Sequence, residues 1–279
     1  MSPLTSLANH RSGTRTRSLL YIDCAFLTSN ALFNPPTYRR WPYIAYMARR
    51  GDSDTLSTKV RERLRLDILS GLWHPGEKLQ LAALSAHYET SSTVVREALT
   101  RLTGARLVEL KPNRGFFVPT LSIDELRDFN ELRCRAEEFG IQLAIERGSL
   151  QWEAEAHAAH HTLERTPRHA SDGSGRVTEE WLTAHEAFHA KLLSSCGLPV
   201  LIELSATLAD GNSMYRRWAV PTKELLGRNI EDEHREILDA ATNRDAARAG
   251  KLLRQHYSLT MELIMKAGLL PEALGDSAA

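Results

Sequence analysis

The sequence is poor in cysteine and has no long run of apolar residues. Its three cysteines, Cys24, Cys134 and Cys196, are too few and too scattered for a disulfide scaffold, and this usage favours a reducing cytoplasm. No stretch is long and apolar enough to span a bilayer, so we expect no membrane partner. These absences argue against a disulfide-stapled secreted domain and against an integral membrane protein.

The sequence also lacks a net charge, because 35 Lys and Arg balance 35 Asp and Glu. This balance hides a difference between two parts of the chain. Residues 55–120 contain 10 Lys and Arg against 6 Asp and Glu, whereas residues 121–279 contain 18 against 26. A basic part beside an acidic part suits one domain that binds a polyanion such as DNA and another that the polyanion repels.

The length and the apolar content suit two modest domains, which we place at residues 55–120 and 121–270. Residues 1–54 show no sustained periodicity, and we expect a disordered tail or a misassigned start, with translation beginning at Met47. A basic DNA-binding arm is the alternative for this segment. Residues 271–279 are expected to form a second disordered tail.

Residues 79–118 have the pattern of a helix-turn-helix followed by a β-hairpin. An amphipathic helix over residues 57–71 precedes them and completes a three-helix domain. A short helix with apolar residues at helical spacing leads through a turn with N-cap chemistry into a second helix, residues 91–104. The inward positions of these two helices are Leu81, Leu84, Tyr88, Val95, Leu99 and Leu102.

The outward face of the second helix carries short polar and cationic side chains, as a helix that enters a major groove requires. Residues 107–110 and 116–118 predict two strands of a wing. Pro112 lacks an N–H and Gly115 can adopt a positive φ, so the tip can bring cations close to phosphates. The predicted contacts with double-stranded operator DNA are Ser91, Ser92, Thr93, Arg96, Thr100, Arg101, Lys111, Arg114 and Gly115.

The pattern becomes wholly helical from Ser122, which opens the capping box Ser122-Ile-Asp-Glu125. On the long helix that follows we expect one inward face made of Leu126, Phe129, Leu132, Ala136, Phe139 and Leu143. Further helices are expected near residues 150–165, 178–196, 199–218, 229–242 and 244–267. The fold class is therefore mainly α: a winged helix-turn-helix followed by an all-α bundle of six or seven helices, large enough to enclose a ligand.

Histidines are the most informative residues of the predicted bundle. His185 and His189 are four residues apart, so both imidazoles lie on one face of a helix. With His234 and His256 from two other helices, they can converge on one divalent metal. A second cluster, His157, His160 and His161, lies on a helix with little amphipathic character, and we interpret it as a solvated face.

The first domain resembles the GntR family of bacterial transcription regulators. The resemblance rests on His74-Pro-Gly-Glu-Lys-Leu79, Val95-Arg-Glu-Ala-Leu99, Leu102 to Val108 and Asn113-Arg-Gly-Phe-Phe-Val118. The chain departs from the family where Ser92 replaces an Arg, Val94 replaces a Pro and Ala82 replaces an Arg. Arg96, the wing and the neighbouring polar residues must then carry more of the DNA contact.

Residues 122–267 resemble the FCD ligand-binding domain of the FadR subfamily. The family's metal motif, D-x-x-F-H followed by two later His, is matched by Phe188-His189, His234 with Ile237, and His256, while His185 occupies the Asp position. Losing that carboxylate favours zinc, nickel or copper over manganese. The resemblance thus implies a divalent transition metal on His185, His189, His234 and His256, with zinc preferred and nickel as the alternative.

The same resemblance implies that Arg133, with Glu137 as its acid, faces an effector cavity. Arg216 or Arg217 offers a second guanidinium, and such forks suit a small carboxylate effector. The runs His185-Glu-Ala-Phe-His189 and Ser194-Ser-Cys-Gly-Leu-Pro-Val-Leu201 are most similar to regulators of glutarate or related dicarboxylate catabolism.

Together these patterns predict a cytoplasmic, homodimeric DNA-binding regulator and not an enzyme. We expect it to act as a repressor. One alternative is a metal-dependent hydrolase, in which the histidines activate water and Glu186 acts as a base. A second is a regulator switched by oxidation of Cys134 or Cys196, although each of these is typical of a small buried hydrophobe.

Overall fold

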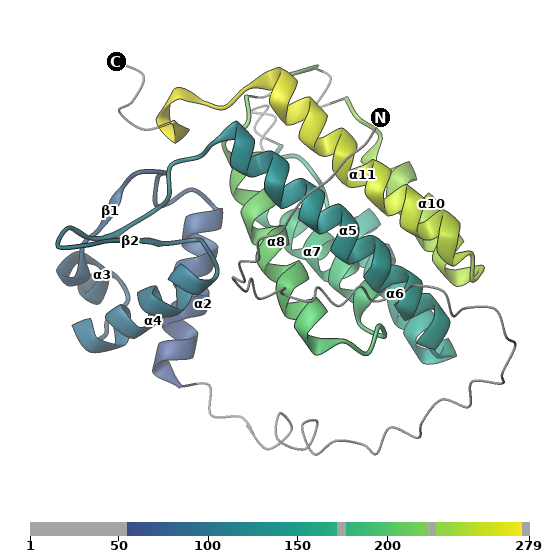
Figure 1. Ribbon diagram of the computed structural model, residues 1–279, viewed down its shortest axis with the longest axis horizontal. Helices are drawn as coiled ribbons and strands as arrows, with labels where there is room; N and C mark the ends of the chain where they lie inside the picture. The colour runs from purple at the N-terminus through teal and green to yellow at the C-terminus, as the bar shows by residue number, and fades with distance from the viewer. Residues whose placement is uncertain (1–54, 172–176, 221, 224–226, 275–279) are drawn as a thin grey trace, which may run out of the picture. The chain divides into compact units, whose positions relative to one another are not determined.

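The computed structural model describes residues 55–171, 177–220, 222–223 and 227–274, all of which belong to one compact unit. The expectations for residues 1–54 and 275–279 lie outside these described residues. The part of the chain that precedes the bundle contains helices α2 (Leu56–Leu69), α3 (Leu81–His87) and α4 (Ser92–Gly104) and strands β1 (Lys78–Leu79), β2 (Glu109–Lys111) and β3 (Gly115–Phe117), as Figure 1 shows.

The helix-turn-helix forms as its sequence predicts. The Ser91 hydroxyl caps α4 by accepting the Val94 N–H, and Glu89 takes a positive φ of 51° in the turn before it. All the predicted inward side chains are buried except Leu81, which is half-buried against the same core. Because the apolar residues recur at helical spacing, α4 can pack on α2 and α3 and leave its other face to solvent.

The wing has one strand more than the sequence indicates. The expected hairpin is present, with β2 and β3 antiparallel, but β1 pairs with the other edge of β3 to give the order β1-β3-β2. β1 has only two residues and follows the Pro75-Gly76 turn. It is therefore too short to show the period-2 pattern that would predict a strand. Asn113 and Gly115 both have positive φ, 59° and 98°, which closes the turn at the tip.

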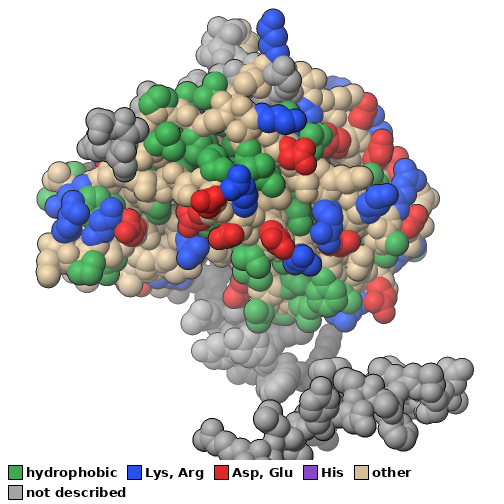
Figure 2. All heavy atoms as spheres, turned by 45° about the horizontal axis from the view of Figure 1, so that its top comes forward, with side chains coloured by type: hydrophobic (Ala, Val, Ile, Leu, Met, Phe, Trp, Pro, Cys, Tyr) green, Lys and Arg blue, Asp and Glu red, His purple; other side chains and the backbone are tan. Residues whose placement is uncertain are grey.

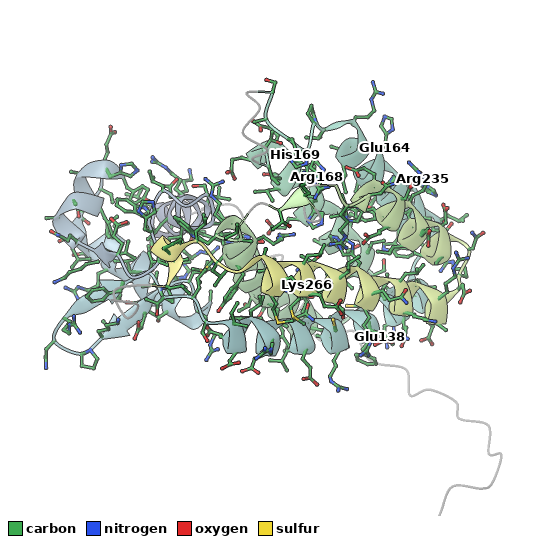
Figure 3. The ribbon with its side chains drawn as sticks, turned by 90° about the horizontal axis from the view of Figure 1, so that it is seen from above. Glu138, Glu164, Arg168, His169, Arg235 and Lys266 are labelled. Carbon is green, nitrogen blue, oxygen red and sulfur yellow. The ribbon has the colours of Figure 1, made fainter. Side chains whose placement is uncertain are left out.

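The second part of the described chain is a helical bundle, which confirms the predicted fold class. Its six helices are α5 (Ile123–Arg147), α6 (Leu150–Arg165), α7 (Glu179–Leu193), α8 (Pro199–Arg217), α10 (Ile230–Thr242) and α11 (Ala246–Ala267). α5 lies side by side with both α11 and α8, while α6 packs against α7 and α10. Ion pairs connect neighbouring helices at the surface, among them Arg235–Glu164 and Arg254–Glu138, whose labelled members lie on the bundle in Figure 3.

The long helix α5 buries a different face from the predicted one. Leu126 and Phe129 are buried, but Leu132 and Phe139 are 55% and 51% exposed. The buried stripe instead contains polar residues, among them Asn130 and Arg133. The predicted inward face is therefore wrong for Leu132 and Phe139, because the interior of this bundle is partly polar.

The start of α5 is correct, but its cap differs from the predicted capping box. Ser122 is the N-cap residue and its side chain makes no capping hydrogen bond. The Tyr215 hydroxyl takes the role expected of the Glu125 carboxylate: it accepts the Ser122 N–H at 3.2 Å, and it donates to Glu125 Oε2 at 3.1 Å. A tyrosine from α8 thus ties the beginning of α5 to the bundle.

Residues 271–273, which the sequence assigns to a disordered tail, pack on the core instead. Pro271–Ala273 form a 3-10 turn, and Ala273 is fully buried and accepts the Leu121 N–H through its carbonyl oxygen. Ala273 belongs to a hydrophobic core that also contains Leu64 of α2 and Tyr215 of α8. This core is continuous from the winged helix into the bundle, and a second core lies between the bundle helices.

Among the described residues, none of the helices has both the length and the apolar character that crossing a bilayer would need.

Candidate metal centre and DNA interface

The predicted DNA-contacting residues of α4 lie on one outward surface. Ser91, Ser92, Thr93, Arg96, Thr100 and Arg101 are all exposed. Three of them have local roles as well, because Ser91 caps the helix, the Thr100 hydroxyl donates to the Arg96 carbonyl at 2.8 Å, and Arg101 Nη1 donates to Thr58 Oγ1 at 3.3 Å. Ser92, Thr93 and Arg96 are the side chains with the most freedom to reach a base edge.

The wing gathers cations around one aromatic ring. The charged groups of Lys78, Lys111 and Arg114 lie 5.9, 4.9 and 5.6 Å from the centroid of the Phe117 ring. Arg114 is exposed, whereas Lys111 is half-buried and pairs with Glu109 at 3.2 Å. Lys and Arg side chains gather at the left end of the face in Figure 2, where Figure 1 places the wing. Lys78, which the sequence did not mark, joins this group because β1 pairs with β3.

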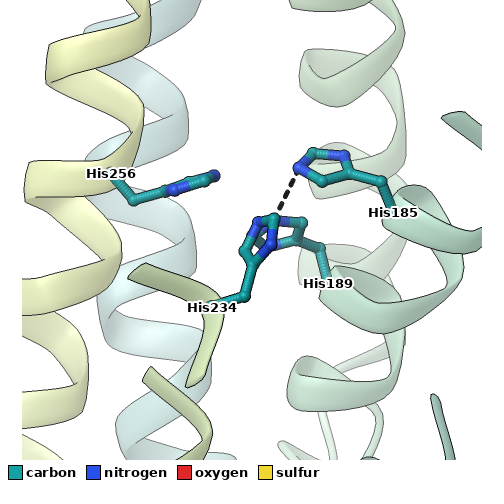
Figure 4. A group of neighbouring side chains, drawn as sticks. All are labelled: His185, His189, His234 and His256. Atoms are coloured by element: carbon teal, nitrogen blue, oxygen red, sulfur yellow. Dashed lines mark hydrogen bonds between the residues drawn. The ribbon is translucent and has the colours of Figure 1, made fainter. Parts of the chain in front are cut away.

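The four predicted metal-ligating histidines meet inside the bundle. His185 and His189 project from α7, His234 from α10 and His256 from α11, and their rings point toward one another in Figure 4. One nitrogen from each ring lies within 4.8 Å of the others, and all four residues are at most 4% exposed. The spacing His185–His189 therefore reflects one shared face of α7, as predicted.

The outer nitrogens of two rings have partners, so their inner nitrogens face the cluster. His256 Nδ1 lies 2.9 Å from Glu233 Oε2, and His189 Nδ1 lies 2.9 Å from the Tyr257 hydroxyl. His234 Nε2 is buried and has no hydrogen-bond partner among the described residues. A buried nitrogen without a partner is costly, and a metal ion would satisfy it. The residues present thus fit a transition metal with imidazole ligands.

Burial keeps these imidazoles neutral. It lowers the pKa of His185, His189 and His234 well below the ordinary value, and the repulsion between neighbouring rings acts in the same direction. The pKa of His256 falls to about 4 because burial outweighs the opposing effect of Glu233. Neutral imidazoles offer the lone pairs that a metal requires, so the electrostatics of the site suit metal binding.

A cavity of about 80 Å³ adjoins the histidines and is lined by Arg133, Glu137, His185, Glu186, His189 and Arg216, among others. Arg133 Nε donates to Glu137 Oε1 at 2.8 Å, and both side chains are buried, as the R-x-x-x-E resemblance implied. Arg216 Nη2 donates to Ser213 Oγ at 2.7 Å, while Arg216 Nε has no partner. Burial and the neighbouring Arg133 lower the pKa of Arg216 to about 10.

Several residues of the sequence interpretation lie elsewhere. Arg217, the alternative to Arg216, faces Glu179 at 3.6 Å. His160, expected on a solvated face, is buried with its ring edge on Phe188, because α6 turns that residue toward α7. Cys134 and Cys196 are buried free thiols, and burial raises the pKa of Cys134, which disfavours a reactive thiolate.

The structure also adds residues that the sequence did not mark. Arg228 donates to Glu233 and to the His256 carbonyl oxygen, so it holds the carboxylate behind His256. Tyr257 contacts His189 from α11. Glu233 immediately precedes His234, but nothing in that spacing says that its partner is His256. Only the three-dimensional packing of α10 against α11 reveals the pair.

The residues above define a class: a winged-helix DNA-binding protein with a helical domain that encloses a polar cavity. The chain matches the family model described as bacterial regulatory proteins, gntR family, over residues 56–118, and the FCD domain over residues 128–259. It is 34% identical over 208 residues to the HTH-type transcriptional repressor GlaR of Escherichia coli (strain K12), covering 73% of this chain and 93% of GlaR.

A second relative is the HTH-type transcriptional regulator BphR of Paraburkholderia xenovorans (strain LB400), which is 31% identical over 209 residues, with 75% of this chain and 85% of BphR covered. The solved structure of E. coli McbR/YncC has a TM-score of 0.62 at 21% identity, covering 76% of this chain and 98% of McbR, and it supports the fold. The chain therefore belongs to the GntR family, with the FCD domain of the FadR-like subfamily. Its relatives are regulators of transcription and not enzymes.

Proposed function

We propose that this regulator is a repressor whose affinity for operator DNA is set by a small organic acid bound at a metal site in its FCD domain. The observation that carries the proposal is the cavity on which buried neutral imidazoles meet the buried guanidinium of Arg133 and the partly buried guanidinium of Arg216. Imidazoles suit divalent transition metals, and guanidiniums suit carboxylates. One ligand that engages both can bridge helices from opposite sides of the bundle.

Zinc is the proposed metal, with nickel as the alternative. His185 stands in the cluster as a neutral nitrogen donor, so the four donors are uncharged imidazoles and favour these ions over manganese. When bound, the ion supplies positive charge that attracts the carboxylate of an effector. His189, His234 and His256 would hold it with His185, and Glu233 orients His256 from behind.

The proposed effector is a small carboxylate, and the resemblance at residues 185–201 implies a dicarboxylate of the glutarate type. Arg133 is committed to Glu137, but Arg216 has no carboxylate partner among the described residues and keeps an unpaired buried Nε. A partly buried cation of this kind is stabilised when an anion pairs with it. Arg216 is therefore the group that gains most from the ligand.

Homodimerisation is supported by the outward face of α5. Leu132 and Phe139 are exposed there, and Val200 and Leu204 are exposed on α8, which packs beside α5. A second copy that covers this surface would place two recognition helices for a pseudo-palindromic operator. We expect Phe139→Asp to yield monomers in analytical ultracentrifugation, whereas Leu150→Asp, at an exposed leucine of α6, should leave the dimer intact. A Phe139→Asp dimer would contradict this surface.

Arg65 provides a route from the cavity to the winged helix. It extends from α2 and bonds both oxygens of the buried Asp210 on α8, with Nε–Oδ2 at 2.7 Å. Its Nη2 also donates to Glu186 Oε1 at 2.6 Å, and its Nη1 donates to Glu62 Oε1 at 3.0 Å. Because Glu186 lines the cavity and Glu62 does not, charge entering the cavity acts on Arg65 through Glu186.

The test begins with a thermal-shift screen of small mono- and dicarboxylates against the zinc-loaded protein, because a ligand of the folded state raises the melting temperature. Operator affinity is then measured with and without the acid that shifts it most. We expect weaker DNA binding with the acid in the wild type and in Glu62→Gln, and a much smaller change in Glu186→Gln. Zinc-loaded protein that responds to none of these acids would contradict the proposal, and an undiminished response in Glu186→Gln would contradict only the route through Arg65.

A further inference from the structure

Tyr257 places its hydroxyl between a candidate metal ligand and a buried ion pair. Its oxygen lies 2.9 Å from His189 Nδ1, and its O–H donates to Glu137 Oε2. The other oxygen of Glu137 accepts Arg133 Nε at 2.8 Å. All four residues are at most 4% exposed, so water does not replace these contacts. A continuous line of hydrogen bonds therefore runs from the cavity residue Arg133 to the histidine cluster.

Counting donors and acceptors fixes where the protons lie. Glu137 forms an ion pair with Arg133 and accepts the Tyr257 O–H, so the single Tyr257 proton is used in that bond. The Tyr257 O–H therefore points to Glu137. The remaining contact of its oxygen must then be an accepted one, from an N–H on His189 Nδ1. A neutral imidazole carries one proton, and its Nε2 is left with a free lone pair.

This Nε2 faces the cluster. His189 Nε2 lies 3.2 Å from His185 Nε2, which is the inner side of the ring, whereas Nδ1 faces α11 and Tyr257. His256 receives comparable support directly from a carboxylate, Glu233. The rings of His189 and His256 are thus each set by a partner on the outer nitrogen, and Tyr257 supplies that partner for His189.

We infer that Tyr257 is a positioning residue for the metal site. Its hydroxyl holds His189 in the tautomer that presents Nε2 to the ion, and Glu137 and Arg133 hold Tyr257 in turn. This inference rests on the proposed metal site. It adds that the cavity residues Arg133 and His189 belong to one hydrogen-bonded unit through Glu137 and Tyr257. The Arg133 guanidinium also lies 4.0 Å from the centroid of the Tyr257 ring. A carboxylate that accepts hydrogen bonds from Arg133 therefore affects, through Glu137 and Tyr257, the imidazole of His189.

Tyr257→Phe tests the role of the hydroxyl, and Tyr215→Phe is a matched control. Tyr215 is also buried and also donates to a carboxylate, Glu125. Among the described residues its hydrogen bonds and ring contacts are with Ser122, Glu125 and Phe129, and not with the four histidines. Zinc affinity is measured by competition with a chromogenic chelator on the full chain. We expect Tyr257→Phe to bind Zn²⁺ about 10- to 100-fold more weakly than the wild type, as removal of an outer partner does at other metal sites, and Tyr215→Phe to be unchanged.

Nitrogen-15 NMR of the histidine rings supplies a readout that a packing role would not move. In wild-type protein without metal we expect the His189 proton on Nδ1, and in Tyr257→Phe a mixture of both tautomers. The wild-type spectrum decides the tautomer even where the variant fails to fold. A His189 proton on Nε2, or equal zinc affinities for the wild type and Tyr257→Phe, would overturn the role of Tyr257. A wild type that binds no zinc at all would instead overturn the metal site on which the inference rests.

Discussion

The winged helix and the bundle treat their polar side chains in opposite ways. In α4 the apolar residues Val95 and Leu99 are buried and the polar ones face solvent. In α5 the buried stripe includes Arg133 and Glu137, while the apolar Phe139 faces outward. The difference teaches where each part acts: the winged helix presents its chemistry on the surface, and the bundle encloses it.

Enclosing polar groups leaves some of their atoms without hydrogen-bond partners. Among the described residues this happens in both parts of the chain, in the winged helix at Ser57, Arg61, Ser85 and Thr90 and in the bundle at Arg216 and His234, among others. A buried donor or acceptor without a partner costs about 1–3 kcal/mol, and among the described residues of the bundle Arg216 Nε and His234 Nε2 are in this state. Both atoms belong to residues at or beside the cavity. A ligand or an ion that supplies a partner for these atoms would therefore stabilise the folded bundle.

The largest expected effect lies where the two regions meet, at Arg65. Arg65→Ala leaves Asp210 buried without its partner, and burial already raises the pKa of Asp210, so we expect a loss of about 3–5 kcal/mol in urea unfolding. The control is Arg135→Ala, whose pair with Glu131 is two-thirds exposed and should change stability by about 0–1 kcal/mol. Equal effects of the two substitutions would mean that the junction is an ordinary surface contact.

The second effect is a pH dependence that belongs to the bundle. In chelator-treated protein the pKa of His256 is about 4 in the folded state, against about 6.5 for an unfolded chain. The unfolded state then binds more protons, so stability is full above about pH 6.5 and falls as the pH drops toward 4, by about 2 kcal/mol at pH 5 from His256 alone. The melting temperature of His256→Gln should fall less over the same range. A parallel pH profile for the two proteins would contradict a neutral buried imidazole.

The third effect belongs to the surface of the winged helix. Arg96→Ala should weaken operator binding by about 1–3 kcal/mol if the side chain reads a base, and leave the melting temperature unchanged because Arg96 is exposed. Arg127→Ala, an exposed arginine of α5, is the control in the same fluorescence-anisotropy titration. Operator affinity that is insensitive to Arg96→Ala would move the readout to other residues of α4 or to the wing.

The smallest effect is local to the recognition helix. Ser91→Ala removes the hydroxyl that accepts the Val94 N–H and should cost about 1 kcal/mol of stability in urea unfolding. Ser91→Asn, which can also cap, should restore most of it. If Ser91→Asn does not restore the stability that Ser91→Ala loses, Ser91 does not stabilise the protein by capping α4.

The sequence predicts the winged helix better than the interior of the bundle, for a physical reason. Apolar spacing and cap residues are local signals, and they locate α4, the wing turn at Gly115 and the four clustered histidines. These signals do not predict which face of α5 is buried, because the buried stripe includes polar residues and the apolar Phe139 is exposed. Contacts such as Tyr257–His189 and Arg65–Asp210 join residues 68 and 145 positions apart, so no local pattern contains them.

The central claim is that the bundle holds one transition metal on four histidines, and native mass spectrometry after zinc loading tests it most directly. We predict one zinc per chain for the wild type and for His160→Gln, which alters a buried histidine outside the cluster, and none for His234→Ala. A zinc-free wild type, or a His234→Ala variant that retains its zinc, would contradict the claim.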